Sequence, residues 1–267
     1  MKTALRKIPP PGQVARSLKK CRAGSAQAPK GDLPFVLINM AMTADGKIAT
    51  ANHDVTSFGS RKDRDHLFEL RATADAVLAG ARTAGEEGIS MGPGGAKYRA
   101  NRLRNRLKEH NLRVIVSGSG SINPQADIFK HRFSPILVIS AQGVPARKLD
   151  SLRKVVEAIA IYGKKNVDLR QALQWLRRDW GVRWLVCEGG GELNAAMLAA
   201  GLVDEIHLTI CPKIFGGRKA PTIADGEGFL CLADATELKL KSKKQIAGEM
   251  FLVYRLNKAK RLKQSAR

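Results

Sequence analysis

The residues best placed to do chemistry form one short run, Glu188, Gly189, Gly190 and Gly191, which follows the apolar segment Trp184–Cys187. A short continuous apolar run predicts a strand buried on both faces. The acid then stands at the carboxyl end of that strand, where open α/β sheets bind ligands. Glycines lack Cβ atoms, so a ligand can approach their backbone closely. Because a helical pattern follows directly, free amides and the helix dipole favour an anion such as a pyrophosphate there.

This glycine run differs from the dinucleotide fingerprint, because it lacks the spacing G-x-G-x-x-G. Many strand-to-helix turns contain glycine for packing reasons alone, so a tight structural turn is the alternative. A second glycine-rich turn, Gly118–Ser121, follows an expected strand at Val114–Ser117. Two such turns in one sheet favour a ligand site more than either does alone.

Length and composition indicate one α/β domain. The chain has 267 residues, of which 44% are hydrophobic, and this is ample for a buried core. No apolar stretch approaches the length of a membrane span, and no signal-peptide pattern opens the chain, so we expect a cytoplasmic protein. The cysteines stand far apart, which predicts reduced thiols and no metal site; they are Cys21, Cys187, Cys211 and Cys231.

The formal net charge of +22 permits a different class of function. Basic residues concentrate in residues 1–30, in Lys97–His110 and after Leu238. Such runs can bind nucleic acid, or they can be solvated faces. With 5% aromatic residues and no nucleic-acid-binding motif, we do not expect nucleic acid as the main partner. A basic nucleic-acid-binding protein without catalysis is nevertheless kept as an alternative.

The hydrophobic pattern predicts a mixed, mostly parallel sheet with helices on both faces and a C-terminal antiparallel hairpin. We expect a basic, disordered arm at 1–32, the domain at 33–257 and a basic tail at 258–267. Ser60 and Asp168 are expected to cap helices. The run from Ala100 to His110 predicts a helix with Leu103 and Leu107 inward. The expected strands are 35–42, 75–80, 114–117, 135–140, 158–162, 184–187 and the hairpin strands 236–242 and 249–256, with Leu238 and Leu240 inward and a turn over 242–248.

Five motifs in order carry a resemblance to a known family. They are NMAMTADGKIAT (39–50), LRATADAVLAGARTA (70–84), RVIVSGSG (113–120), EGGGELN (188–194) and GLVDEIHLTICPKIFGGRKAPTIADGEGF (201–229). From about Leu33 to Leu256 the chain resembles the riboflavin-biosynthesis reductases. These form the C-terminal half of the bacterial bifunctional deaminase-reductase and also occur as stand-alone archaeal and fungal enzymes, and the last motif is closest to the archaeal form.

The resemblance implies a dihydrofolate-reductase-like fold, a homodimer, and NADPH-dependent reduction of a ribosylaminopyrimidine 5′-phosphate to the ribitylamino compound. In such a reaction the cofactor supplies the hydride, and the protein supplies positioning and charge. The stand-alone form favours the diaminopyrimidinone over the deaminated uracil as substrate. The residues alone leave NADPH and NADH both possible. The zinc deaminase motif P-C-x-x-C is absent, so another protein is expected to deaminate.

The resemblance also assigns roles to residues. Glu188 and Arg71 match substrate-binding positions, with Arg71 as a partner for the ribose phosphate. Glu188 and Asp45 are the candidate catalytic residues, Asp45 as a polariser or proton relay, although an Asp-Gly turn residue is the alternative for it. Asn39 and Met42 are expected beside the substrate and the nicotinamide. The implied cofactor-binding residues are Met42, Thr83, Glu87, Ser117, Gly118, Ser119, Gly190, Gly191, Glu192, Leu193 and Asn194.

Two segments depart from the family pattern. The family has D-D-P-x-L-T where this chain has Glu86–Met91, so Glu87 keeps the negative charge but the proline and threonine are missing. The loop at 53–57 also lacks the bacterial serine and tryptophan. These differences support a further alternative, in which the fold and cofactor are kept and the substrate is another pyrimidine, a pterin or a folate-like molecule.

Overall fold

The computed structural model describes residues 31–53 and 58–256. Most of the expected arm and the whole basic tail therefore lie outside the described residues, as do positions 54–57 of the divergent loop. Among the described helices, none is long and apolar enough to cross a membrane.

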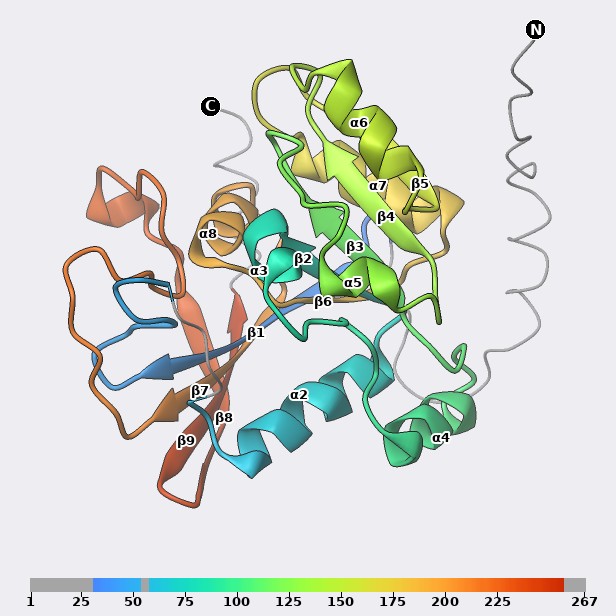
Figure 1. Cartoon of the computed structure of the whole chain (residues 1–267). Coiled ribbons are helices and arrows are strands. Elements are labelled where there is room, and N and C mark those ends of the chain that lie inside the picture. Colours follow the sequence, from blue (N-terminus) through green and yellow to red (C-terminus); the bar gives the residue numbers. More distant parts are fainter. Residues whose placement is uncertain (1–30, 54–57, 257–267) are drawn as a thin grey trace, which may run out of the picture.

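A single nine-stranded sheet organises the described chain, with the strand order β5-β4-β3-β2-β6-β1-β7-β9-β8. The strands from β5 to β7 pair in parallel, and β9 runs antiparallel to both β7 and β8. Figure 1 shows β6 between β2 and β1, although β2, β3, β4 and β5 come between β1 and β6 along the chain. The strands are β1 (Phe35–Thr43), β2 (Ala76–Gly80), β3 (Leu112–Val116), β4 (Ile136–Ser140), β5 (Ala158–Ile161), β6 (Trp184–Cys187), β7 (Glu205–Cys211), β8 (Leu238–Ile246) and β9 (Glu249–Leu256).

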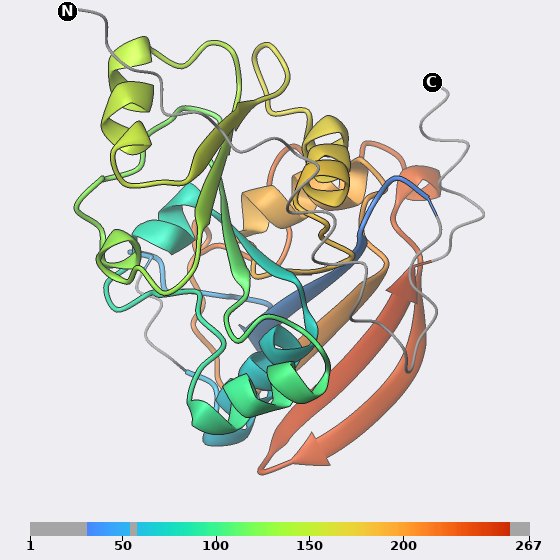
Figure 2. The ribbon, with the colours of Figure 1, turned by 90° about the vertical axis from the view of Figure 1, so that its right-hand side faces the viewer.

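Helices cover both faces of this sheet (Figures 1 and 2), because successive side chains of its continuously apolar strands point to opposite faces and both sets must be buried. One face packs against α7 (Leu169–Asp179) and α8 (Gly191–Ala199). The other face packs against α2 (Arg61–Thr73) near β1 and β6, and near β2, β3 and β4 it packs against α3 (Ala81–Gly85), α5 (Asp127–Lys130) and α6 (Ala146–Arg153). The remaining helical elements of the described chain are α4 (Ala96–Arg104) and the short η1 (Leu232–Asp234). The predicted fold class is confirmed.

The predicted helix caps are also confirmed. Ser60 accepts hydrogen bonds from the amides of Lys62 and Asp63, and so begins α2. Asp168 accepts from the amide of Gln171 and begins α7. In both cases the side-chain oxygen satisfies amides that have no partner within the helix, which is a local effect that sequence alone can predict.

The basic helix was predicted wrongly in both its extent and its buried face. It spans Ala96–Arg104, and its buried residues are Tyr98 and Arg102, whereas Leu103 is 55% exposed. An apolar pattern points inward only where the neighbouring surface is apolar. Here the neighbour is the carboxyl end of α2, whose carbonyl groups favour a cation.

The C-terminal hairpin exists, but two of its details differ from the prediction. Strand β8 extends to Ile246, and its turn consists of Ala247 and Gly248, both with positive φ. Two such residues close a tight hairpin whose twist matches that of the strands, so no longer turn is needed. Every residue of β8 is exposed in the single chain, including Leu238 and Leu240, because β8 is the edge strand and none of the described helices covers it.

Candidate active site

The register of the sheet brings the turns named above to one edge. Cys187 of β6 pairs with Ile38 on one side and Leu78 on the other. The next amide, of Glu188, donates to the Leu78 carbonyl at 2.8 Å, and Gly80 donates to the Gly189 carbonyl at 2.9 Å. The carboxyl ends of β6 and β2 therefore lie together, beside β1, which continues to Thr43. The order of strands along the chain reverses here, a position at which α/β sheets form binding crevices.

The glycine turn after β6 leads directly into α8, whose first amides have no hydrogen-bond partner among residues 31–53 and 58–256. Gly189 and Gly190 have φ values of +58° and +73°, a region that residues with a Cβ atom rarely adopt. In α8, Asn194 is the first residue whose amide bonds back to the turn, at the Gly190 carbonyl, and Gly190 provides no side-chain cap. Within the described chain the three preceding amides of α8 are thus available, and they lie at the positive end of the helix dipole. This arrangement fits a pyrophosphate.

The side chains in the first turn of α8 differ in role from its backbone. Leu193 packs into the core, and Asn194 is 1% exposed, with its amide nitrogen donating to the Ile223 carbonyl at 2.8 Å. Only Glu192 is exposed, and its negative charge disfavours an anion close to it. The structure therefore leaves the backbone of these positions, and not their side chains, to meet a cofactor.

Gly191 is constrained by packing as well. A Cβ atom there would lie 2.6 Å from the Thr222 carbonyl oxygen and would also meet the Asp225 carboxylate. Asp225 in turn accepts hydrogen bonds from the amide and hydroxyl of Thr222, and its own amide donates to the Gly191 carbonyl. The sequence singled out the glycine but missed Asp225, because nothing local in the sequence pairs positions so far apart.

Arg71 and Glu188, predicted separately as substrate contacts, are bound to each other. The Arg71 Nε and Nη2 atoms each donate to one oxygen of the Glu188 carboxylate, both at 2.6 Å, and the two side chains are 8% and 11% exposed. Arg71 Nη1 donates to the Gly92 carbonyl at 2.7 Å, and its guanidinium lies over the Phe68 ring. Such a bidentate pair is strong and fixed in direction. Sequence analysis missed Gly92, which lies 21 residues from Arg71 and has no local signal.

Asp45 is exposed and holds two loops together. Its carboxylate accepts from the Thr43 hydroxyl at 2.6 Å and from the amides of Phe215 and Gly216 at 3.2 and 2.7 Å. These bonds, first that from Thr43, hold its pKa below the usual range, so the carboxylate is ionised at neutral pH. The contacts fit the turn alternative, and the proton-relay role stays a prediction.

The two expected ligand contacts on β1 face opposite sides of the sheet. Met42 packs against the core beneath α8, on the same side as Val36 and Ile38. Asn39 alternates with these residues and is half-buried on the α2 side, beside Leu37. At the neighbouring strand end, the Thr83 hydroxyl lies 3.4 Å from the Gly189 carbonyl oxygen, so Thr83 does border the glycine turn.

The turn after β3 is built differently. Ser117 is buried, and its hydroxyl has no hydrogen-bond partner within the described chain. Ser119 and Gly118 are exposed, and Lys148 of α6 reaches the turn, donating to the Ser119 carbonyl at 3.2 Å and to the Ser121 hydroxyl at 2.8 Å. Sequence analysis did not single out Lys148.

Glu87 is exposed in the divergent loop, and its charge acts on Lys130, whose pKa is raised mainly by the hydrogen bond to Asp127. The neighbouring Gly88 amide donates to the Asp127 carboxylate at 2.8 Å. The loop is thus tied to α5, and the cofactor contact expected of Glu87 stays a prediction.

Cys187, the last residue of β6, directly precedes Glu188 and the glycine turn. Burial raises the pKa of the Cys187 thiol to about 12, so this thiol is neutral and a poor nucleophile.

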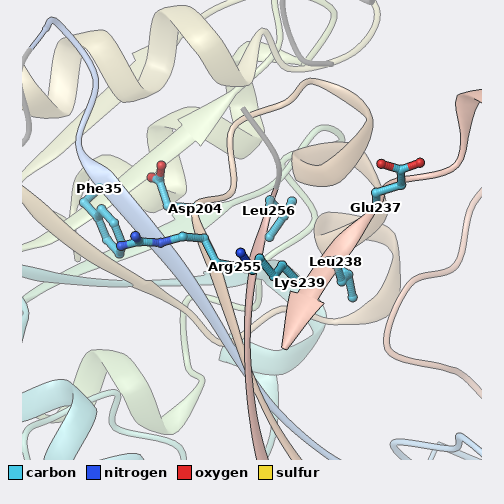
Figure 3. Close-up of a pocket in the computed structure, with 7 residues that line it drawn as sticks. All are labelled: Phe35, Asp204, Glu237, Leu238, Lys239, Arg255 and Leu256. Carbon is cyan, nitrogen blue, oxygen red and sulfur yellow. The ribbon is translucent and has the colours of Figure 1, made fainter. Parts of the chain in front are cut away.

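A cavity of about 640 Å³ lies elsewhere, at the opposite ends of these strands. Figure 3 shows it where β1 begins and β9 ends, with the Arg255 side chain extending toward Phe35. It is far from the glycine turn in the strand direction and belongs to a different part of the fold. Its lining residues are Phe35, Asp204, Glu237, Leu238, Lys239, Arg255 and Leu256.

Known proteins share both this sequence and this fold. Residues 34–252 match the model of the RibD C-terminal domain. A 2,5-diamino-6-ribosylamino-4(3H)-pyrimidinone 5′-phosphate reductase from Methanothermobacter thermautotrophicus is 33% identical over 83% of this chain and 97% of its own length. A relative of the same name from Archaeoglobus fulgidus is 32% identical over 74% of this chain and 89% of its own length.

Among solved structures, a pyrimidine reductase-like protein from Corynebacterium diphtheriae superposes with a TM-score of 0.70 at 21% identity, covering 84% of this chain and 92% of the other. That likeness supports the fold. The family match extends over the strands, the glycine turn and the Arg71–Glu188 pair described above. Because sequence and architecture agree over most of its length, the chain belongs to the RibD C-terminal domain family.

Proposed function

We propose that this protein reduces a ribosylaminopyrimidine 5′-phosphate to the ribitylamino product with NADPH, and that its substrate is the diaminopyrimidinone. The names of the archaeal relatives support this substrate. The observation that carries the proposal is the placement of a buried Arg71–Glu188 pair directly beside the unpaired amides of α8. One strand end thus offers a sugar-recognition group next to a pyrophosphate cradle.

In this proposal the bound nicotinamide supplies the hydride, and the chain's residues orient both ligands. The first amides of α8 would hold the pyrophosphate. Arg71 uses three of its five N–H groups on Glu188 and Gly92. Among the described residues each Glu188 oxygen accepts from Arg71 alone, which leaves it a second lone pair for a substrate. The pair can therefore donate to and accept from a substrate without rearranging.

The charge of the Arg71–Glu188 pair argues against the expected role of Arg71 as a partner for the ribose phosphate. Since Glu188 neutralises Arg71, the two together carry no net charge. They suit sugar hydroxyl groups and pyrimidine amino groups better than a doubly charged phosphate, which gains most from an unpaired cation. We therefore assign the pair to the opened sugar and the base edge of the substrate.

The test is a turnover assay with purified full-length protein, NADPH or NADH, and each of the two ribosylaminopyrimidine phosphates. Loss of nicotinamide absorbance should be fastest with NADPH and the diaminopyrimidinone. Faster turnover of the deaminated uracil would reassign the substrate, and faster turnover with NADH would reassign the cofactor. No oxidation with any pair would favour a pterin, a folate-like molecule or another pyrimidine.

We also propose that the protein is a homodimer and acts in the cytoplasm. The support for the dimer is a stretch of exposed apolar side chains before and within β8, which are Phe229, Leu230, Leu232, Leu238 and Leu240. Sedimentation should give twice the mass of the chain, and Leu230→Asp should shift it toward the monomer. Leu103→Asp, on exposed α4, is the control and should leave the mass unchanged. A monomeric wild-type protein would refute the dimer.

A further inference from the structure

The basic run from Lys97 to His110 has no role in the reaction proposed above, although its charge first suggested nucleic acid. Three of its cations are occupied within the protein. Lys97 pairs with Asp65 and Arg99 with Glu109 at the surface. Arg102 differs from both, because it is 1% exposed and turned into the protein. A buried cation is costly, so its position calls for a physical account.

Arg102 is satisfied by backbone carbonyl groups in place of a carboxylate. Its Nη1 donates to the carbonyls of Arg71 and Ala74 at 2.5 and 2.6 Å, and its Nε donates to the Lys108 carbonyl at 2.9 Å. Burial lowers the pKa of Arg102 to about 10, so the guanidinium is still charged at neutral pH. It therefore sits as a cation against the last carbonyls of α2, at the negative end of that helix dipole.

These carbonyls otherwise lack strong partners within α2. The amide of Ala74 reaches the Arg71 carbonyl only at 3.4 Å, and the amide of Asp75 donates instead to Trp184 of β6. Helix α4 also contacts α2 at Asp65, nearly two turns before Arg71, through a hydrogen bond from the Tyr98 hydroxyl. Figures 1 and 2 both show α4 against the carboxyl half of α2.

The carbonyl that Arg102 holds belongs to the same residue whose side chain binds Glu188. Arg71 is thus fixed at both ends: its backbone by Arg102, and its guanidinium by Glu188 and by Gly92 of the loop that leads into α4. A guanidinium positions a carboxylate only if its own Cα atom is held, because several freely rotating bonds lie between them.

We propose that Arg102 is a positioning residue, which caps α2 from α4 and thereby holds the Arg71–Glu188 pair in the geometry that binds substrate. This rests on the proposed function for its kinetic consequence, but not for its structural one. The basic helix α4 then supports the active site without contacting the substrate.

The kinetic test compares three variants of the full-length enzyme: Arg102→Met, Arg102→Lys and Arg104→Met. Arg104 is the matched control, since it is exposed on the same helix. Arg102→Met should raise KM for the pyrimidine about tenfold and leave KM for NADPH within about twofold, because the α8 amides do not depend on α2. Arg102→Lys should recover part of the loss. Equal rises in both KM values would overturn the proposal.

A double-mutant cycle separates positioning from general destabilisation. In a Glu188→Gln background the pair is already broken, so Arg102→Met should change KM for the pyrimidine by less than about twofold. If the full tenfold effect persists there, Arg102 acts by another route and the proposal fails.

A second readout needs no turnover. The Arg71 Nε–H resonance of the ligand-free protein, identified by its loss in Arg71→Lys, should be shifted and protected from exchange by Glu188 in the wild type. In Arg102→Met it should move toward the position of a free arginine, and in Arg104→Met it should not move. If Arg102→Met does not fold, Arg102→Lys carries the measurement. An unmoved resonance in the folded variant refutes Arg102 as a positioning residue, whereas an inactive wild type refutes only the proposed function.

Discussion

The turn after β6 and the turn after β3 have similar glycine content but differ in whether their backbone amides are hydrogen-bonded. After β6, Gly189 and Gly190 have positive φ and a nine-residue helix follows at once, and the first amides of this helix have no partner in the part of the chain that the structure describes. After β3, the amides of Gly120, Ser121 and Ile122 all bond within the turn. No helix follows this second turn until α5. The comparison shows that unpaired amides, rather than glycines as such, make an anion site.

The largest expected effect comes from removing the charge beside the first turn. Glu188→Gln should lower the free energy of unfolding by about 3 kcal/mol, because it leaves Arg71 buried without its counter-ion. It should also lower kcat/KM by about a hundredfold. Ser117→Ala, at the second turn, removes a hydroxyl that has no partner in the described chain and should cost less than about 1 kcal/mol. Urea unfolding measures the stability of both variants, and steady-state kinetics measures their kcat/KM. Equal losses in the two variants would contradict the difference inferred between the two turns.

A matched pair of glycine substitutions tests the backbone directly. Gly190→Ala should cost about 1 to 3 kcal/mol and weaken NADPH binding, because φ of +73° is strained for alanine. Gly118→Ala should change stability by less than about 0.5 kcal/mol, since its added Cβ meets nothing within 4 Å and its φ is not positive. Thermal unfolding and fluorescence titration with NADPH check this. If Gly118→Ala weakened NADPH binding more than Gly190→Ala does, the pyrophosphate would be assigned to the turn after β3.

A substitution of Lys148 tests whether the turn after β3 recognises the 2′-phosphate of NADPH. If that turn meets the adenosine side of the cofactor, Lys148→Met should raise KM for NADPH about three- to tenfold and leave KM for NADH nearly unchanged, because only NADPH carries a 2′-phosphate. The ratio of the two KM values is the measurement. Equal changes with both cofactors would remove Lys148 from phosphate recognition.

The smallest effect is expected at the turn after β1, which serves as a reference without an anion site. The folded state lowers the pKa of Asp45, mainly through the Thr43 hydroxyl, so its stabilising contribution is complete above the ordinary pKa of 3.8 and is lost as pH falls through the lower folded value. The difference in unfolding free energy between wild type and Asp45→Asn should therefore be constant from about pH 5 to 8 and shrink below 3.8. Urea titrations at several pH values check this. A difference that grows on acidification would contradict the assignment.

Local signals predicted much of the fold. Ser60 and Asp168 begin helices because a side-chain oxygen bonds amides two or three residues away. Continuous apolar runs predicted β2, β4 and β6 because buried parallel strands admit little else. The buried face of α4 was predicted wrongly, with Leu103 inward, because the neighbour that covers this helix is α2, which precedes it in the chain. Local periodicity carries no information about such a distant neighbour.

The candidate site divides in the same way. Its glycines and its acid could be predicted because strand, turn and helix are contiguous between Trp184 and Ala199. The pairing of Glu188 with Arg71, 117 residues away, could not be predicted as a contact from spacing, nor could the carbonyl of Gly92 beneath it. The Arg71–Glu188 contact depends on the insertion of β6 between β1 and β2, because Glu188 directly follows β6.

The sequence by itself determined which segments become strands and helices, where two helices begin, and that one strand ends in an acid and three glycines. Only the tertiary structure decided that this acid is neutralised, that the first amides of α8 are free, and that a cation from a basic surface helix is buried behind the site. The physical reason is range. Caps, turns and periodicity act over a few residues, whereas ion pairs and burial depend on which distant segments the sheet order brings together.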